Sequence, residues 1–242
     1  MSGPQCCSNP PVLDSSCGAG HVEKLGGLDS YVTGSPDSKL AILLISDVFG
    51  YDAPNLRKLA DKCATAGFFV VVPDFLHGDP YVIKNAESPL EGFDVWFKDH
   101  GTDKGVVEAK SVIEALKSKG VSSVGAAGFC WGAKVVVDLA KTDIIQAGVL
   151  LHPSFVTNED FNEVKVPISI LGAEIDIMTP AEVVKQFEAV LARKSAVEFF
   201  VKIFPKVEHG WTVRYDVGDE EAVKKAEEAR QDLLEWISKY VK

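Results

Sequence analysis

One cysteine stands where a catalytic thiol would be expected. Cys130 is the centre of Gly128-Phe-Cys-Trp-Gly132, between a run of small and β-branched residues and an apolar run of helical length. This is the sequence form of a nucleophile elbow, a sharp strained turn whose neighbours must lack bulk. A helix that starts after Cys130 would point its positive end at the sulfur and lower the thiol pKa. The pattern predicts a nucleophile, although an inert core cysteine is the commoner occupant of such a place.

An acid and a histidine follow in the order that this nucleophile requires. Asp176 and His209 each come after a predicted strand, so the chain order is Cys130, Asp176, His209, as in α/β-hydrolase triads. His209 would hold or receive the thiol proton, and Asp176 would fix its tautomer and stabilise the imidazolium. Glu174 is the alternative acid. We prefer Asp176, because Glu174 follows its strand too closely to swing towards a loop histidine.

Two backbone N–H groups are expected to bind the developing oxyanion. One belongs to Trp131, which follows the nucleophile, and the other to Val48, in the loop after the first buried strand. His152 also ends a strand, but it precedes the acid, so we interpret it as a pocket-lining or core histidine. His77 and His100 are predicted to be surface residues.

Alternating strands and helices must position these side chains. Strands are predicted at 30–33, 39–46, 68–72, in the stretch before Cys130, and at 146–152, 166–172 and 196–204. Helices are predicted at 53–66 with Asp52 as N-cap, 102–119, 133–141, 180–193 and 219–242. Residues 75–101 are predicted to be irregular and to form a lid or substrate-pocket segment. The alternation favours an α/β fold with a mostly parallel, doubly wound sheet, whose chemistry lies at the carboxyl ends of the strands.

Composition indicates an ordinary globular protein. The 242 residues are 46% hydrophobic and carry a net charge of −10, which argues against nucleic acid and anionic membranes as partners. No apolar run approaches transmembrane length, and residues 1–20 lack the apolar segment of a secretory signal, so a cytoplasmic location is expected. We expect an arm at 1–20, a single domain at 21–242, and a monomer or weak homodimer.

The five cysteines do not form a disulfide framework, because their number is odd and three crowd into the arm. Cys6, Cys7 and Cys17 with His21 are a conceivable zinc cluster, but their spacing matches no common site. A loosely ordered arm with reduced thiols is the preferred interpretation, with no metal or cofactor. Cys130 alone is expected to be partly exposed and activated.

The chain resembles the dienelactone hydrolase family from about residue 20 to its end. The matching pieces are 45–50, 72–74, 128–132, 172–180 and 209–211. The resemblance implies an α/β-hydrolase fold, a Cys130-His209-Asp176 triad, and hydrolysis of a small ester or lactone through a thioester. It also implies that Asp47 interacts with the resting thiol.

The family's bacterial members clamp a substrate carboxylate with two arginines. In this sequence Arg214 is the one arginine placed to serve, and it is expected near the pocket mouth. Trp211 and His152 complete the expected substrate-binding set. The missing second arginine leaves open whether the substrate carries a carboxylate.

Two other functions remain as alternatives. Similar plant sequences with a Cys-Cys-rich start are labelled endo-β-glucanase-like, and a glucanase needs two carboxylates across a sugar cleft. Asp74, Asp79 and Glu87 are candidates, but nothing in their spacing favours that chemistry. Some α/β-hydrolase folds are non-catalytic small-molecule binders, and the intact triad argues against that interpretation.

Overall fold

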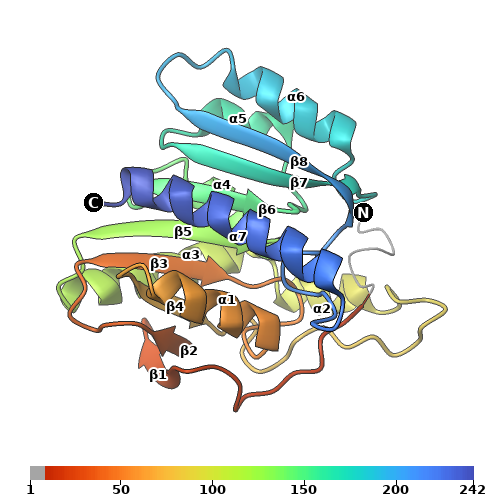
Figure 1. The fold of residues 1–242 in the computed structure, drawn as a ribbon, viewed down its shortest axis with the longest axis horizontal. Coiled ribbons are helices and arrows are strands. Elements are labelled where there is room, and N and C mark those ends of the chain that lie inside the picture. The colour runs from red at the N-terminus through yellow and green to blue at the C-terminus, as the bar shows by residue number, and fades with distance from the viewer. Residues whose placement is uncertain (1–8) are drawn as a thin grey trace.

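An eight-stranded sheet forms the centre of the molecule, as Figure 1 shows for the computed structural model, which describes residues 9–242. Its strands lie in the order β1-β2-β4-β3-β5-β6-β7-β8. The strand bounds are β1 His21–Leu25, β2 Leu28–Thr33, β3 Leu40–Ile45, β4 Phe69–Pro73, β5 Ser123–Phe129, β6 Ala147–Leu151, β7 Ile168–Ile175 and β8 Phe199–Glu208. Strands β4, β3, β5, β6, β7 and β8 run parallel, whereas β1 and β2 pair antiparallel at one edge.

Helices cover both faces of this sheet. Their bounds are α1 Pro54–Ala64, α2 Phe93–Asp99, α3 Thr102–Ser118, α4 Trp131–Leu139, α5 Asn158–Glu163, α6 Ala181–Leu191 and α7 Glu220–Tyr240. Helices α1 and α7 lie in front of the sheet in Figure 1, and α3 and α4 lie behind it. Each face buries its own hydrophobic cluster. The central strands are therefore apolar on both sides, which explains their uninterrupted runs of hydrophobic residues. The predicted α/β fold with a mostly parallel sheet is confirmed.

Several predicted elements need correction. Residues 75–101 are not wholly irregular, since they contain α2. The N-cap of helix α1 is Ala53, which has no capping side chain, and the carboxylate of Asp52, the predicted cap, pairs with the guanidinium of Arg57. Strand β1 and helix α5 were missed, because both are short and the burial of β1 does not alternate.

The described part of the arm is attached to the domain, contrary to the loosely ordered arm expected. The Arg57 guanidinium donates to the Ser15 carbonyl at 2.7 Å, and the Ala19 amide donates to the Asp61 carboxylate at 2.9 Å. Cys6 and Cys7 lie outside the described residues. Within residues 9–242, no three His, Cys, Asp or Glu side chains gather closely enough to hold a metal ion. In the same range, no helix combines the length and apolar composition that crossing a bilayer requires.

Candidate active site

Cys130 occupies a strained turn between β5 and α4. Its φ of 52° and ψ of −107° place it outside the conformations that L-residues ordinarily adopt. A Cβ on Gly128 would lie 2.1 Å from the carbonyl oxygen of Gly132, and one on Gly132 would lie 2.1 Å from that of Ile45. Strand and helix therefore approach so closely that both flanking positions require glycine. This is the geometry that the G-x-C-x-G pattern predicts.

Asp176 and His209 meet at the carboxyl end of the sheet. Asp176 Oδ2 lies 2.8 Å from His209 Nδ1, and Asp176 Oδ1 accepts from the amides of Met178 at 2.8 Å and Thr179 at 3.2 Å. Glu174, the alternative acid, instead accepts from the Lys206 amide at 2.7 Å. The turn after β7 thus aims Asp176, and not Glu174, at the histidine.

The electrostatics of His209 favour an imidazolium. Burial acts to lower the pKa of this ring, but the charge of Cys130 and hydrogen bonds with Asp176 and Cys130 outweigh it and raise the pKa to about 9. A thiolate facing an imidazolium is the activated form of a cysteine nucleophile. The structure therefore brings together the three residues that the sequence predicts for the triad.

The thiol itself is enclosed, which corrects the expectation that it is partly exposed. Cys130 has 0% exposed surface. Its sulfur lies 3.3 Å from the hydroxyl oxygen of Ser154, a residue that sequence reasoning missed. Among the described cysteines Cys17 is the most exposed, and Cys63 is buried. Burial raises the pKa of Cys63 to about 12, so that thiol is inert.

The two amides nominated for the oxyanion hole lie in suitable places. Val48 is buried in the loop after β3, and Trp131 is the first residue of α4. Within residues 9–242, no described acceptor lies on either amide. The neighbouring amides do donate: Phe49 to the side-chain oxygen Asp47 Oδ1 at 2.9 Å, and Cys130 to the Leu151 carbonyl at 3.1 Å. The amides of Val48 and Trp131 therefore remain available to a developing oxyanion.

Asp47 and Arg214 form a buried ion pair, with Arg214 Nε 3.3 Å from Asp47 Oδ2 and side-chain exposures of 1% and 3%. Burial raises the pKa of Asp47, while the charges of Arg214 and His209 and the Phe49 amide act in the opposite direction. The resemblance implies that Asp47 interacts with the resting thiol; the described partners of its carboxylate are the Phe49 amide and Arg214. Arg214 is thus a buried, paired arginine that also borders the cavity beside His209.

Gly210 explains how this arginine reaches the site. A Cβ there would lie 2.2 Å from Arg214 Nε, and the backbone has a φ of +90°. The guanidinium therefore lies directly on the glycine that follows His209.

His152 was expected to line the pocket or to belong to the core, and its burial is that of a core residue. It has 0% exposed surface, its Nε2 lies 2.7 Å from Thr212 Oγ1, and its ring packs edge-on against His209 with centroids 4.9 Å apart. Burial, together with the charges of His209 and Arg214, holds the pKa of His152 well below its usual range. His152 is thus a neutral core residue behind His209, which agrees with our interpretation that it is not the base.

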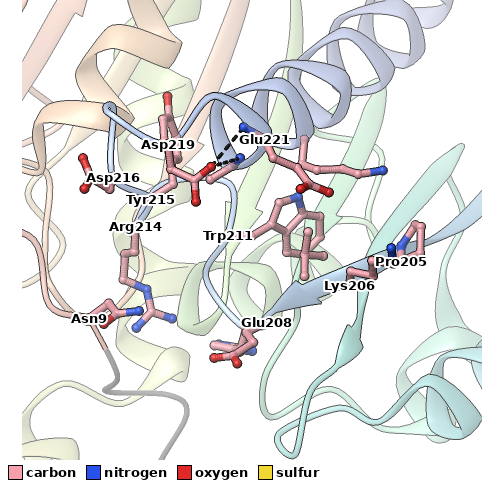
Figure 2. A pocket seen from close by; sticks show the side chains of 14 residues that line it. Asn9, Pro205, Lys206, Glu208, Trp211, Arg214, Tyr215, Asp216, Asp219 and Glu221 are labelled. Carbon is pink, nitrogen blue, oxygen red and sulfur yellow. Dashed lines mark hydrogen bonds between the residues drawn. The ribbon is translucent and has the colours of Figure 1, made fainter.

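A cavity of about 550 Å³ opens beside His209, between β8, the following loop and the start of α7. Figure 2 shows Trp211, Arg214 and Glu208 around it, with Asp219 and Glu221 on the helix side. Trp211 lines this cavity, and its part in substrate binding stays a prediction. The lining carries side chains of both charges: Lys206, Glu208, Arg214, Asp216, Asp219, Glu221 and Lys225.

Two of the three residues considered for a glucanase have partners other than a second carboxylate. Asp74 is buried, and its two oxygens accept from the amides of Leu76 at 3.1 Å and Gly78 at 2.6 Å. Asp79 lies 3.5 Å from His100, a buried residue and not the surface histidine expected. Neither carboxylate faces a second one in these contacts.

Comparison with known proteins identifies relatives of this chain. The profile of the dienelactone hydrolase family matches residues 28–241. An endo-1,3;1,4-beta-D-glucanase of Zea mays is 44% identical over 81% of this chain, but the match spans 64% of that protein. A carboxymethylenebutenolidase homolog of Mus musculus is 34% identical, covering 93% of this chain and 92% of the relative.

Solved structures agree at the level of the fold. A dienelactone hydrolase from Anabaena variabilis superposes with a TM-score of 0.68 and 16% identity, covering 96% of this chain and 100% of that one. At this identity the likeness shows an α/β-hydrolase fold, and function has to come from the site.

Proposed function

Because the chain belongs to the dienelactone hydrolase family, we propose that it hydrolyses a small ester or lactone through a thioester on Cys130. Family membership and the carboxymethylenebutenolidase homologues indicate a carboxylic ester or lactone hydrolase. The observation that carries the mechanism is the buried Asp176–His209 contact of 2.8 Å, set opposite a thiol on a strained elbow.

In the first half of the reaction, the Cys130 sulfur attacks the substrate carbonyl carbon. The carbonyl oxygen becomes an oxyanion and accepts hydrogen bonds from the Val48 and Trp131 amides. When the tetrahedral intermediate collapses, the carbon–oxygen ester bond breaks and His209 gives its proton to the departing alkoxide. The products of this half are an alcohol and a thioester on Cys130.

In the second half, water attacks the thioester carbon and His209 takes a proton from it. Collapse then breaks the carbon–sulfur bond, releasing the acid and restoring the thiolate beside an imidazolium. Asp176 stabilises the imidazolium of the free enzyme and the imidazolium that re-forms when water attacks, since its carboxylate faces Nδ1. The sum of the two halves is one ester and one water converted to one acid and one alcohol.

The substrate is proposed to be uncharged at the position where bacterial lactonases bind a carboxylate. The guanidinium of Arg214 already has the Asp47 carboxylate at 3.3 Å and is buried. A second anion would have to compete for a charge that is already paired. Neutral esters and lactones avoid that competition.

Turnover of an activated ester tests the proposal. The wild type should release p-nitrophenol from p-nitrophenyl acetate with a burst that matches the enzyme concentration, and a mass spectrum should show one acetyl group on Cys130. The Cys130→Ala variant, which keeps the fold, should show neither. Release of reducing sugar from a β-1,3;1,4-glucan, with no loss in Cys130→Ala, would favour a glucanase instead.

A further inference from the structure

The end of β6 and the segment that follows it contact Cys130 and His209 directly, and they contact the turn that holds Asp176 through Thr179. The Cys130 amide donates to the Leu151 carbonyl at 3.1 Å, and the Ser154 amide donates to the Cys130 carbonyl at 3.2 Å. The His152 ring packs on His209. The Thr179 hydroxyl, next to the turn that holds Asp176, donates to the Pro153 carbonyl at 2.7 Å.

One side chain of this segment touches the reacting atom. Ser154 Oγ lies 3.3 Å from Cys130 Sγ, and Ser154 has 0% exposed surface. Backbone hydrogen bonds on both sides of the pair fix the two residues relative to each other, so the contact is built into the fold. A thiolate can only accept a hydrogen bond, whereas a serine hydroxyl can rotate to donate one.

We propose that Ser154 is a positioning residue that donates a hydrogen bond to the ionised sulfur of Cys130 and holds it in line for attack. The inference rests on the proposed function, because it assigns Ser154 a role at the same nucleophile. When Cys130 is a neutral thiol, its S–H can donate to Ser154 Oγ. The hydroxyl can therefore pair with the thiol and with the thiolate by rotation alone, without a backbone movement.

The hydroxyl acts beside several charged or titratable groups. His209 faces the sulfur from the loop after β8, with Asp176 and neutral His152 packed against its ring. Asp47 and Arg214 form an ion pair that also interacts electrostatically with His209 and His152. Ser154 is uncharged over the whole accessible pH range, so removing its hydroxyl changes the thiolate without adding or removing a charge.

The pH profile of Ser154→Ala tests this role. Loss of a donor to a charged group should raise the pKa of the Cys130 thiol by about one to two pH units. The acid limb of kcat/KM for p-nitrophenyl acetate should move to higher pH by that amount, and kcat/KM at neutral pH should fall about tenfold or more. The rate of Cys130 alkylation should show the same shift of its acid limb.

Ser169→Ala is the matched control. Ser169 has 0% exposed surface, and within residues 9–242 its hydroxyl has no hydrogen-bond partner. The same substitution there should leave the pH profile unchanged. Ser154→Gly removes the same hydroxyl and carries the test if the alanine variant does not fold, while Ser154→Thr keeps a hydroxyl and should restore the acid limb.

An acid limb in Ser154→Ala and Ser154→Gly that matches the wild type would overturn the inference. So would an equal loss of kcat/KM at every pH, because it would indicate a purely structural role. Activity that persists in Cys130→Ala would instead refute the proposed function. If Cys130→Ala is inactive and Ser154→Ala is unaltered, this inference alone fails.

Discussion

Replacing Asp176 with asparagine separates the acid's chemistry from its structural role. Its Oδ1 accepts from two amides of the following turn, and its Oδ2 faces His209 Nδ1. An asparagine can keep its carbonyl oxygen on the two amides and turn its NH₂ group towards the histidine. The turn should therefore survive, while His209 loses its acceptor and is driven to the wrong tautomer.

The size of the loss follows from the burial of this contact. The side chains of His209 and Asp176 are 0% and 1% exposed, so water cannot replace the lost partner. A hydrogen bond to a charged group contributes about 1.5–3 kcal/mol, which is about ten- to 150-fold in rate. The wrong tautomer extends the loss to about 10⁴-fold in serine triads. We therefore expect kcat/KM to fall between about 10²- and 10⁴-fold. The pKa of His209, held at about 9 in part by Asp176, should also decrease.

The assay is steady-state hydrolysis of p-nitrophenyl acetate across the pH range, with circular dichroism to check the fold. Glu174→Gln is the matched control, since it makes the same change two residues away at a carboxylate that accepts only from the Lys206 amide among its described partners. Near wild-type activity in Asp176→Asn together with an inactive Glu174→Gln would transfer the role to Glu174 and refute the geometric reasoning.

Three further outcomes follow from burial and close packing. Iodoacetamide should modify the partly exposed Cys17 before the enclosed Cys130, and activity should be retained while Cys17 reacts. Peptide mass spectrometry follows both sites, and earlier modification of Cys130 with loss of activity would show that its thiol is not enclosed. Arg214→Ala should lower the free energy of unfolding by about 3–5 kcal/mol, because it leaves the buried Asp47 unpaired, and urea unfolding of a double variant without either charge should recover part of it. Gly132→Ala should lower the free energy of unfolding by about 3 kcal/mol or more, since the new Cβ would lie 2.1 Å from a backbone oxygen of β3; a normal urea midpoint would show that the elbow can relax.

The elements most visible in the sequence are those whose residues satisfy a local rule. The buried parallel strands appear as continuous apolar runs because helices cover both faces of the sheet. The elbow is visible because Gly128 and Gly132 are the residues that such a close approach permits. The order of Asp176 and His209 was visible because parallel strands bring the ends of β7 and β8 to the same edge.

The features that the sequence did not predict depend on contacts between segments that are distant in the chain. Ser154 is 24 positions from Cys130, and no local pattern marks a serine that will lie against a sulfur. The pairing of Asp47 with Arg214 joins two loops across the site. The enclosure of the thiol likewise results from several loops packing together, and sequence spacing at Cys130 carries no information about it.

The segment at 75–101 was predicted, from its length, to form a lid or part of the substrate pocket. Its contacts show which parts of the proposed site it touches. The Tyr81 amide donates to the Val48 carbonyl at 2.8 Å, which ties the segment to the loop of the proposed oxyanion hole. The His100 carbonyl accepts from Trp131 Nε1 at 2.9 Å, which ties it to the start of α4.

A third contact joins this segment to the loop that bears Ser154. The Phe97 ring of α2 stacks on Phe155 with centroids 5.0 Å apart. Aromatic stacking of this kind contributes about 0.5–1.5 kcal/mol, much less than the backbone bonds and strained turn that fix Cys130. Because the sulfur is anchored from both sides and has no exposed surface, a substrate carbonyl can reach it only when the cover yields. Phe155 directly follows Ser154, so the Phe97–Phe155 contact is where α2 covers the loop beside the sulfur.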